Sequence, residues 1–502
     1  MRGLALLVCV VAVAVALGVP GGMSGAVEHK RPNFVFLLAD DLDGTTMPYW
    51  DALPKTARLV RDRGLTFSNA FVPISLCCPA RAAILTGKYG HNSGVLTNAG
   101  DQGGWPTFVR NGNEERTFAK GLADGGYRTA LVGKYLNRYE DRPGHVPPGW
   151  TEWYGAADKN FYNGYDYVLN ENGTLVRYGS KESDYSTDVV ARKSVEFIER
   201  AAASGEPFML YASPTAPHLG LKPPSRYRDH PWADARAPER PNFQERDVSD
   251  KPAWLRKSAE ARSKAVDELN DADYRDRMGA LMAFDDMVGD IVGALRATGR
   301  LDDTYLVFVS DNGYNLGAHR LLDKQAPYEE SIRVPMAIAG PGIRKGVDRR
   351  TVLNIDFAPT FLDLAGRPVP ADMDGRSLRP LLTGSAPPPK GWRSDFLVQY
   401  VGTPGLGIAQ ERPPGPVGRR ADEGFDLPSF LGVRTGRYLY VRWYAADDRP
   451  HEYELYDLKK DPYQLRNLLA TSEGREHYAR LVRKLDDRMR ALSVCTGGGC
   501  RS

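Results

Sequence analysis

The sequence predicts an α/β protein in which a large, mostly parallel sheet is flanked by helices and followed by a smaller α+β domain. Two observations carry this prediction. Short apolar runs rich in β-branched and aromatic residues alternate with longer segments of helical periodicity, and polar residues follow directly after each run. A proline-rich stretch, "SAPPPKGW", marks a boundary near residue 385, so we expect a catalytic domain over 30–384 and a smaller domain over 385–502.

The expected strands are four apolar runs, which are typical of buried parallel strands. They are "NFVFLLA" (33–39), "RTALVG" (128–133), "PFMLYAS" (207–213) and "TYLVFVS" (304–310). Between the runs lie apolar residues with helical spacing, in "STDVVARKSVEFIERAAA" (186–203) and "DRMGALMAFDDMVGDIVGALRATG" (276–299). This alternation of strand and helix favours a parallel central sheet.

Length and charge set limits on function. The chain has 502 residues, of which 42% are hydrophobic and 26% charged, which suits one large core and a smaller one. The formal net charge is only +3, so we expect no nucleic-acid partner and only local positive charge.

The amino terminus predicts a secretory signal peptide over residues 1–26. One arginine precedes an apolar run from Leu4 to Val19, and small residues follow as far as Ala26. A permanent anchor needs about 20 apolar residues with polar flanks. We therefore expect a secreted or extracytoplasmic protein with no stable membrane anchor.

The cysteines fall into two groups once Cys9 leaves with the signal peptide. Cys495 and Cys500 bracket "TGGG", a flexible spacer that favours a small terminal disulfide over a metal site. Cys77 and Cys78 are neighbours, and adjacent cysteines rarely bond to each other because the ring is strained.

Polar residues follow all four expected strands. They are Asp40, Asp41 and Asp43 after the first run, Lys134 after the second, His218 after the third, and Asp311 with Asn312 after the fourth. Taken singly, each is open to a structural interpretation as a helix cap, a turn or a solvated side chain. Ligands bind beyond the carboxyl ends of strands in open α/β sheets, so one site could collect them all.

The acidic members of this set favour a hard cation. Asp40, Asp41, Asp311 and Asn312 offer only oxygen ligands, which suit calcium or magnesium better than zinc. Carboxylates this close would repel one another unless a cation neutralised them. The basic residues expected on the other side are Arg81, Lys88, Lys134, His218 and Lys324. A cation facing several bases suggests a small tetrahedral oxyanion held between them.

The cysteine pair precedes an expected helix. Pro79 is placed like the first residue of a helix, "ARAAILTG" continues it, and Gly87 ends it. Cys77 would then lie just outside the helix amino terminus, where backbone donors favour an anionic group.

The stretch "SLCCPARAAILTGKY" resembles the CxPxR signature of the formylglycine-dependent (type I) sulfatase family, with Cys77, Pro79 and Arg81 in the fixed places. Only Cys77 fits, because counting from Cys78 puts Ala80 at the proline position. "FLLADDLDG", "VSDNGYNLGAHRLLDKQAPYEESIRVP" and "YELYDLKKDPYQLRNL" resemble other segments of the family. The resemblance therefore spans nearly the whole mature chain.

Within the family, four segments look most like N-acetylglucosamine-6-sulfatases: "LCCPARAAILTGKYGHN", "GKYLNRY", "HVPPGWTEWY" and "CTGGGC". One position departs from many arylsulfatases, which carry a histidine where this chain has Leu136, and Asn137 is a candidate for part of that role.

The resemblance implies an alkaline-phosphatase-like sulfatase fold and a sulfuric ester hydrolase. It implies that a formylglycine-generating enzyme converts Cys77 to formylglycine, whose hydrate is the nucleophile. It further implies that one divalent cation, foremost Ca²⁺, is held by Asp40, Asp41, modified Cys77, Asp311 and Asn312. Arg81, Lys134 and Lys324 would stabilise the sulfate and His218 would protonate the leaving oxygen. The substrate would be a sulfated carbohydrate, foremost a 6-sulfated N-acetylglucosamine or a glycosaminoglycan.

Other interpretations stay open. An arylsulfatase, or a phosphomonoester or phosphonate hydrolase of the same superfamily, would share the sheet and metal site, and an exported carbohydrate-binding protein would share the fold with a dead site. His91, His145 and His319 are further pocket candidates. Trp150, Trp153 and Tyr154 are candidate platforms for a sugar ring, although such residues are as often core.

Overall fold

The computed structural model describes residues 31–45, 48–260, 265–384, 391–402, 427–445 and 449–501. The expected signal peptide over 1–26, Cys9 and residues 385–390 of the proline-rich boundary lie outside the described residues. Among the described residues, no helix combines the length and apolarity needed to cross a membrane.

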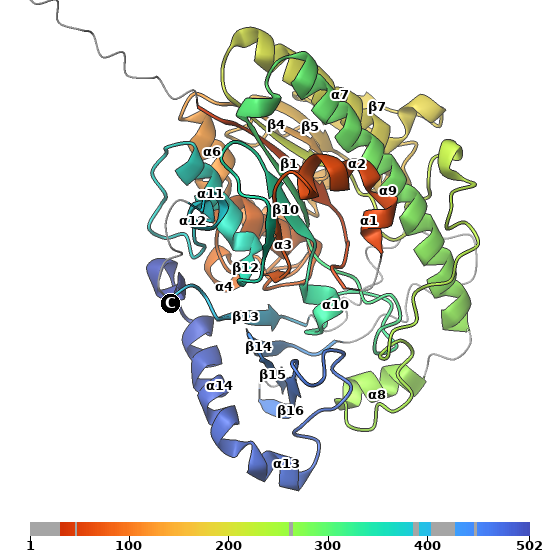
Figure 1. Cartoon of the computed structure of the whole chain (residues 1–502), viewed down its shortest axis with the longest axis vertical. Helices are drawn as coiled ribbons and strands as arrows, with labels where there is room; N and C mark the ends of the chain where they lie inside the picture. Colours follow the sequence, from red (N-terminus) through yellow and green to blue (C-terminus); the bar gives the residue numbers. More distant parts are fainter. Residues whose placement is uncertain are drawn as a thin grey trace, which may run out of the picture. The chain divides into compact units, whose positions relative to one another are not determined.

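A large sheet of ten strands forms the centre of the protein, in the order β11-β2-β10-β9-β1-β8-β4-β5-β6-β7 (Figure 1). The expected runs are strands β1 (Asn33–Ala39), β4 (Arg128–Gly133), β8 (Phe208–Ser213) and β9 (Thr304–Ser310). These central strands pair in parallel, as predicted. The remaining strands of the sheet are β2 (Leu65–Phe67), β5 (Glu152–Ala156), β6 (Val168–Glu171), β7 (Thr174–Arg177), β10 (Met336–Ala339) and β11 (Gly346–Asp348).

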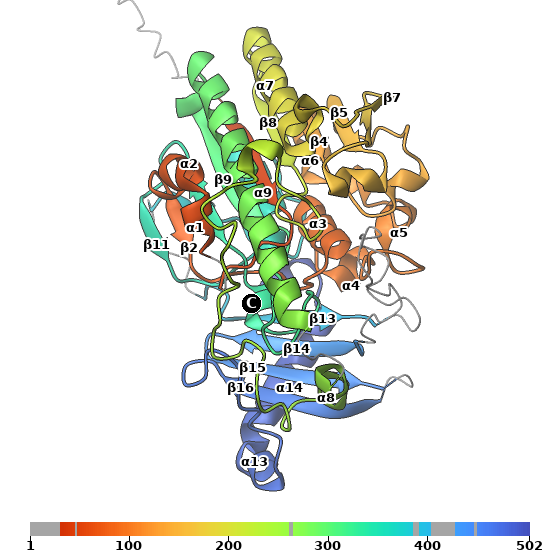
Figure 2. The same cartoon turned by 90° about the vertical axis from the view of Figure 1, so that its right-hand side faces the viewer.

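Strand β1 is buried on both faces, which explains its unbroken apolar sequence. Successive side chains of a strand point to opposite faces. Val35 and Leu37 join the core beneath helices α7 (Ser186–Ser204) and α9 (Ala265–Ala297), which lie side by side in Figures 1 and 2. Phe34 and Phe36 join the core on the other face, against α3 (Cys77–Thr86), α6 (Phe118–Ala123) and α11 (Phe357–Leu364).

Both long helices predicted from periodicity are confirmed, and α9 begins earlier than its apolar pattern indicates. The pattern starts at residue 276, whereas the helix starts at Ala265. The shorter helices are α1 (Tyr49–Ala52), α2 (Pro54–Thr56), α4 (Gly90–Ser93), α5 (Gly104–Arg110), α8 (Ala253–Glu260), α10 (Glu329–Ile332) and α12 (Arg379–Leu382).

A second, antiparallel sheet follows in the carboxyl-terminal region (Figure 2). Its strands are β13 (Asp395–Tyr400), β14 (Phe430–Thr435), β15 (Tyr438–Tyr444) and β16 (Pro450–Asp457). Helices α13 (Ser472–His477) and α14 (Ala479–Ser493) complete it, and α14 contacts β13, β14 and β15. The predicted class, a large sheet with a smaller α+β region, is therefore confirmed.

The predicted disulfide is present between Cys495 and Cys500. Its loop docks on the end of α4, where Asn92 Nδ2 donates to the Cys495 carbonyl at 2.8 Å. The amide of Gly497 donates to Asp374 Oδ1 at 2.6 Å, and the other oxygen of Asp374 accepts from the amide of Tyr89 at 2.8 Å. The disulfide thus fastens the carboxyl end of the chain close to the end of α3.

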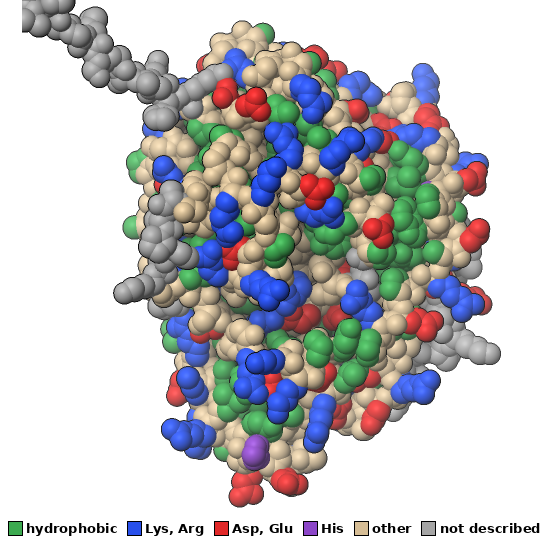
Figure 3. Space-filling view, viewed as in Figure 1, with side chains coloured by type: hydrophobic (Ala, Val, Ile, Leu, Met, Phe, Trp, Pro, Cys, Tyr) green, Lys and Arg blue, Asp and Glu red, His purple; other side chains and the backbone are tan. Residues whose placement is uncertain are grey.

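The two shortest strands, β3 (Ala70–Phe71) and β12 (Val352–Leu353), form a separate parallel pair. On the face shown in Figure 3, Lys and Arg side chains are spread among acidic and apolar ones. This distribution agrees with the small net charge of the sequence.

Candidate functional site

The candidate site lies at the carboxyl ends of the central parallel strands. Asp40 and Asp41 follow β1, Lys134 follows β4, and Asp311 follows β9. His218 comes five residues after the end of β8, and all of these residues are buried. Because β8 and β9 pair with β1 on either side, the strand order brings residues from distant parts of the chain together.

The backbone at Asp41 is held in an unusual conformation. Its φ is +64°, a left-handed value that most residues avoid. Its amide donates to Asp311 Oδ1 at 3.1 Å, and its carbonyl accepts a hydrogen bond from Arg277. Arg277 also donates to the carbonyl of Pro217 at 2.9 Å, so one buried guanidinium from α9 fixes two of the loops that build the site.

Helix α3 begins at Cys77, two residues earlier than the sequence suggests. Leu76 is the N-cap in an extended conformation, and Pro79 is the third helical residue. The shift is tolerated because the amides of the first turn have no partner within the helix, so a proline there loses nothing. The amide of Cys78 donates instead to Asn98 Oδ1 at 2.8 Å. Gly87 ends the helix with φ +68°, as predicted.

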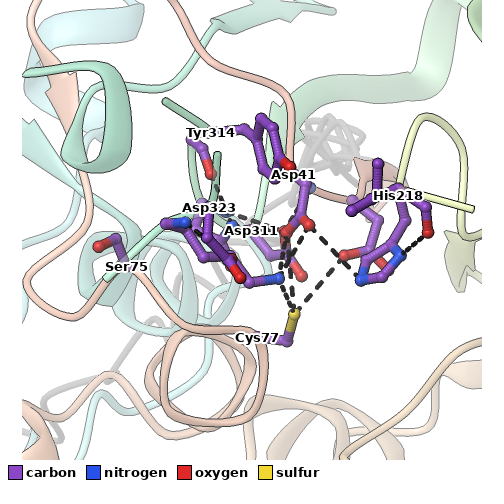
Figure 4. Close-up of polar contacts among 12 residues, drawn as sticks. Asp41, Ser75, Cys77, His218, Asp311, Tyr314 and Asp323 are labelled. Atoms are coloured by element: carbon purple, nitrogen blue, oxygen red, sulfur yellow. Dashed lines mark hydrogen bonds and ion pairs between the residues drawn. The ribbon is translucent and has the colours of Figure 1, made fainter. Parts of the chain in front are cut away.

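The sulfur of Cys77 points into the acidic cluster (Figure 4). It lies 3.7 Å from Asp40 Oδ1 and 3.8 Å from Asp41 Oδ1. The ammonium of Lys324 lies 2.9 Å from the sulfur and 2.6 Å from Asp41 Oδ1. Both cysteines are buried, and Cys77 is in contact with these charged groups, which agrees with the register of the signature.

Two further cations face the carboxylates. Lys134 Nζ lies 2.7 Å from Asp40 Oδ2, and Arg81 Nε donates to Asp311 Oδ2 at 2.7 Å. Arg81 also donates to Ser213 Oγ at 2.7 Å. These contacts preorganise the basic side chains before any substrate arrives.

The electrostatics of the site follow from this arrangement. Burial alone would raise the pKa of Asp40, but Lys134 and Arg81 outweigh it and hold that pKa well below the usual range. The pKa of Asp311 moves the other way, to about 6, because of burial and the repulsion of Asp40. Burial also lowers the pKa of His218, although Asp41 and Asp40 oppose it.

The donor set fits a divalent cation. Ligand atoms of Asp40, Asp41, Cys77 and His218 all lie within 4.8 Å of one another. The side-chain oxygen of Asn312 is buried and has no hydrogen-bond partner among the described residues, while its nitrogen donates to Asp41 Oδ1 at 2.7 Å. A buried orphan acceptor beside carboxylates is the environment that a hard cation satisfies. Asp40, Asp41, Asp311 and Asn312, together with the side chain at Cys77, are thus the residues that could hold it.

Not every predicted residue joins this site. Lys88 pairs with Asp372 at 2.6 Å, because it lies beyond the opposite end of α3, so its expected place against the acidic cluster is wrong. Asp43 accepts a hydrogen bond from the amide of Thr45 at 3.0 Å.

The three further histidines have other neighbours. His91 Nε2 lies 3.1 Å from the Cys495 carbonyl, His145 Nε2 lies 3.0 Å from Glu114, and His319 Nδ1 lies 2.6 Å from Glu245.

The expected aromatic platform is core. Trp153 is fully buried, and its Nε1 donates to the hydroxyl of Tyr139 at 2.8 Å. Trp150 and Tyr154 are also buried. None of the three can receive a sugar ring without rearrangement of the core, so the structural interpretation holds for them.

Three further residues contact the site but were not predicted from the sequence. Ser213 ends β8 and could have been found by the rule that found Lys134, since it too is the polar residue at a strand end. Arg277 lies inside a long helical pattern and gives no local signal. Tyr162, whose ring lies against Lys134 and His218, belongs to a short 3-10 helix that periodicity does not detect.

The fold and the site together define a hydrolase of small anionic esters, with a buried cysteine at a helix start between acidic and basic side chains. The sulfatase family model matches residues 32–367, and the chain belongs to the sulfatase family of sulfuric ester hydrolases.

Relatives agree over nearly the whole length. The chain is 35% identical to an N-acetylglucosamine-6-sulfatase of Capra hircus, covering 96% of this chain and 87% of the relative. It is also 35% identical to the human N-acetylglucosamine-6-sulfatase, covering 97% and 90%.

A solved structure described as a complex with its substrate D-glucosamine-2-N,6-O-disulfate superposes with a TM-score of 0.72 at 25% identity, covering 92% of this chain and 97% of the other. A phosphonate monoester hydrolase from Silicibacter pomeroyi has the same fold, with a TM-score of 0.65 at 22% identity and coverage of 92% and 96%.

Proposed function

We propose that this sulfatase removes the 6-sulfate from N-acetylglucosamine or a glycosaminoglycan that contains it, by way of formylglycine at position 77 and a bound divalent cation, Ca²⁺ foremost. The observation that carries the proposal is the position of the Cys77 sulfur, within 4 Å of Asp40, Asp41 and Lys324 at the start of α3. At that position, carboxylates and an ammonium group surround the side chain of Cys77.

Formylglycine would supply a hydrated aldehyde as the nucleophile, and the cation would polarise the sulfate oxygens. Asp40, Asp41, Asp311 and Asn312 would hold the cation. The start of α3 adds backbone donors and the positive end of the helix dipole.

Lys134, Lys324 and Arg81 would bind and orient the sulfate. Each is already anchored by a carboxylate at 2.6–2.7 Å, so little reorganisation is needed when negative charge develops on the ester. A charge pair at about 4 Å and an effective dielectric near 20 is worth on the order of 4 kcal/mol before desolvation.

His218 would protonate the leaving oxygen. Its Nδ1 lies 2.7 Å from the carbonyl of Leu219, which fixes the proton on that nitrogen. Nε2 therefore faces the site, 3.5 Å from Asp41 Oδ2. Nε2 carries a proton to donate only when the ring is charged, and Asp41 and Asp40 favour that form, while burial lowers the pKa of His218 and makes the charged ring a stronger acid.

The substrate part of the proposal is supported by relatives. Two N-acetylglucosamine-6-sulfatases match over nearly the whole chain, and the solved structure with a TM-score of 0.72 holds a 6-O-sulfated glucosamine. We also propose export after removal of residues 1–26, and a division into a catalytic domain over 30–384 and a carboxyl-terminal domain over 385–502. The separate antiparallel sheet from β13 onward supports that division.

The proposal is tested by a panel of substrates given to protein made in a host with the formylglycine-generating enzyme. N-acetylglucosamine 6-sulfate should have a higher kcat/KM than 4-sulfated N-acetylgalactosamine, an aryl sulfate or a phosphomonoester. Preference for the aryl sulfate would reject the sugar and leave the sulfatase activity standing. Preference for the phosphomonoester would reject the proposal that a sulfate ester is the main substrate.

The modification is tested by tryptic mass spectrometry of the same protein. The aldehyde should appear at position 77 and a thiol at position 78, because Pro79 and Arg81 stand at the signature spacing from Cys77 and not from Cys78. Full activity from protein with both thiols intact would reject the formylglycine mechanism.

A further inference from the structure

Tyr162 lies against two of the groups proposed to handle the sulfate. Its ring centroid is 4.8 Å from the ring centroid of His218, at an interplanar angle of 63°. The ammonium of Lys134 lies 4.8 Å from the same centroid. One aromatic side chain therefore spans the ends of the loops that follow β4 and β8.

The segment that carries Tyr162 is firmly placed. It is a 3-10 helix, Lys159–Asn163, capped at its start by Asp158, which accepts a hydrogen bond from the amide of Asn160 at 3.0 Å. Phe161 is fully buried, and its carbonyl accepts from Thr215 Oγ1 at 3.4 Å. Gly164 ends the helix at φ +86°, where a side chain would also approach Tyr185 to 2.9 Å.

Exposure distinguishes Tyr162 from its two neighbours. His218 and Lys134 are only 5% and 4% exposed, whereas Tyr162 is half-buried. Tyr162 therefore offers exposed aromatic surface beside two side chains that are themselves almost inaccessible.

We propose that Tyr162 is a specificity-determining residue whose ring receives the carbohydrate part of the substrate. The apolar C–H face of a pyranose packs on aromatic rings, and a rigid tyrosine supplies such a surface at low entropic cost. This inference rests on the proposed sugar substrate and adds the side chain that recognises the ring. It also replaces the buried Trp153 as the aromatic platform.

The competing account is that Tyr162 only supports Lys134 through the cation–π contact. In that case its loss would reduce the turnover of every sulfate ester alike, because Lys134 would act on the sulfate common to all of them. Recognition of the sugar would instead change the ratio between substrates.

The experiment compares N-acetylglucosamine 6-sulfate with ethyl sulfate, which has no ring, by the sulfate released. In Tyr162→Ala the ratio of kcat/KM for the sugar to kcat/KM for ethyl sulfate should fall at least tenfold, mainly through KM. Tyr162→Phe should restore the ratio to within threefold of the wild type, because the ring and not the hydroxyl makes the contact.

Tyr165→Ala is the matched control. Tyr165 is also a half-buried tyrosine just beyond the same helix, but its ring packs on Tyr185 at 5.4 Å, so its loss should leave the ratio unchanged. If Tyr162→Ala does not fold, Tyr162→Leu keeps an apolar side chain without a ring, and the same tenfold fall is expected.

A second readout does not depend on turnover of the sugar. Unsulfated N-acetylglucosamine should inhibit ethyl sulfate hydrolysis by the wild type, and its inhibition constant should rise at least tenfold in Tyr162→Ala. An equal loss on both substrates, or an unchanged inhibition constant, would overturn the role of Tyr162 while the proposed function stands. A wild type that hydrolyses ethyl sulfate but no sulfated N-acetylglucosamine would reject the substrate, and this inference with it.

Discussion

Two buried carboxyl groups of this protein, Asp311 at the candidate site and Glu329 beneath the second sheet, have opposite electrostatics. Both are almost inaccessible to solvent. The pKa of Asp311 is raised to about 6, whereas the pKa of Glu329 is lowered to about 2. Burial raises the pKa of each, so the neighbours decide the difference.

Glu329 has matched neighbours. Its Oε2 accepts from Arg333 Nε at 2.8 Å and its Oε1 accepts from Arg434 Nε at 3.0 Å. The guanidinium groups lie 4.5 and 4.7 Å from the ring centroid of Phe71. With two guanidinium groups around one carboxylate, Glu329 is fully paired, and the cluster joins α10 to strand β14.

Asp311 shares its cations with other acids. Arg81 is 2.7 Å from Asp311, but it also lies 3.4 Å from Asp40, whose charge repels that of Asp311. A buried carboxylate that lacks enough nearby cations, such as Asp311, is typical of a ligand-binding site. A buried carboxylate that is fully paired, such as Glu329, is typical of a structural ion pair.

The largest expected effect tests the site side of this comparison. Asp311→Asn should lower kcat/KM by about 10²–10³-fold, the usual cost of losing one preorganised electrostatic group. The free energy of unfolding of the chelated protein should not fall as it does for the Glu329 variant below, because the substitution removes an unfavourable charge. Normal activity together with a large loss of stability would show that Asp311 has a structural role and not a catalytic one.

The next effect tests the structural side. Glu329→Gln should lower the free energy of unfolding at neutral pH by about 3 kcal/mol, because Arg333 and Arg434 hold the pKa of this carboxyl at about 2 in the folded protein only. Because the folded pKa lies below the unfolded one, this stabilisation is present above about pH 4.5 and is lost as pH falls toward 2. Urea titrations of both proteins across that range should converge at low pH, and a constant difference would contradict the assignment.

Removal of the cation should have a slightly smaller effect on stability than Glu329→Gln. Exhaustive chelation should lower activity as far as Asp311→Asn does and should lower the melting temperature, since a cation at a hundred times its Kd contributes about 2.7 kcal/mol to stability. Asp311→Asn should no longer respond to chelation, while Glu329→Gln should respond as the wild type does. An unchanged melting temperature and no bound divalent ion by elemental analysis would argue against a metal site.

The smallest effect concerns a third buried acid, Asp374, which is held by backbone and amide donors. Cys495→Ser with Cys500→Ser opens the loop whose Gly497 amide binds Asp374, and should cost about 2 kcal/mol of stability. Activity at a temperature where the variant is folded should be retained, because the loop lies at the far end of α3. A loss of activity without a loss of stability would show that this end of the helix also tunes the site.

Strands are easiest to predict from the sequence where both faces of the strand are buried. The run at 33–39 is unbroken and apolar because β1 contacts a core on each face, and the same holds for the run at 304–310. Strands at the sheet margins, such as β2 and β11, are three residues long and give no such signal.

The sequence by itself determined where the central strands end, because an apolar run changes to charged residues where the chain leaves the buried core. It thereby also located Asp40, Lys134 and Asp311 at the carboxyl ends of these strands. It also determined that Cys77 and not Cys78 fits the signature, since the spacing to Pro79 and Arg81 is local.

Only the tertiary structure decided which side chains meet. Arg277 reaches the carbonyl of Asp41 across more than 230 positions, and Lys88 turns to Asp372 across a similar distance in the chain. Such contacts leave no periodic trace because they depend on how distant loops pack. The balance that sets the pKa of Asp311 high and that of Glu329 low is likewise a property of neighbours that only the folded chain brings together.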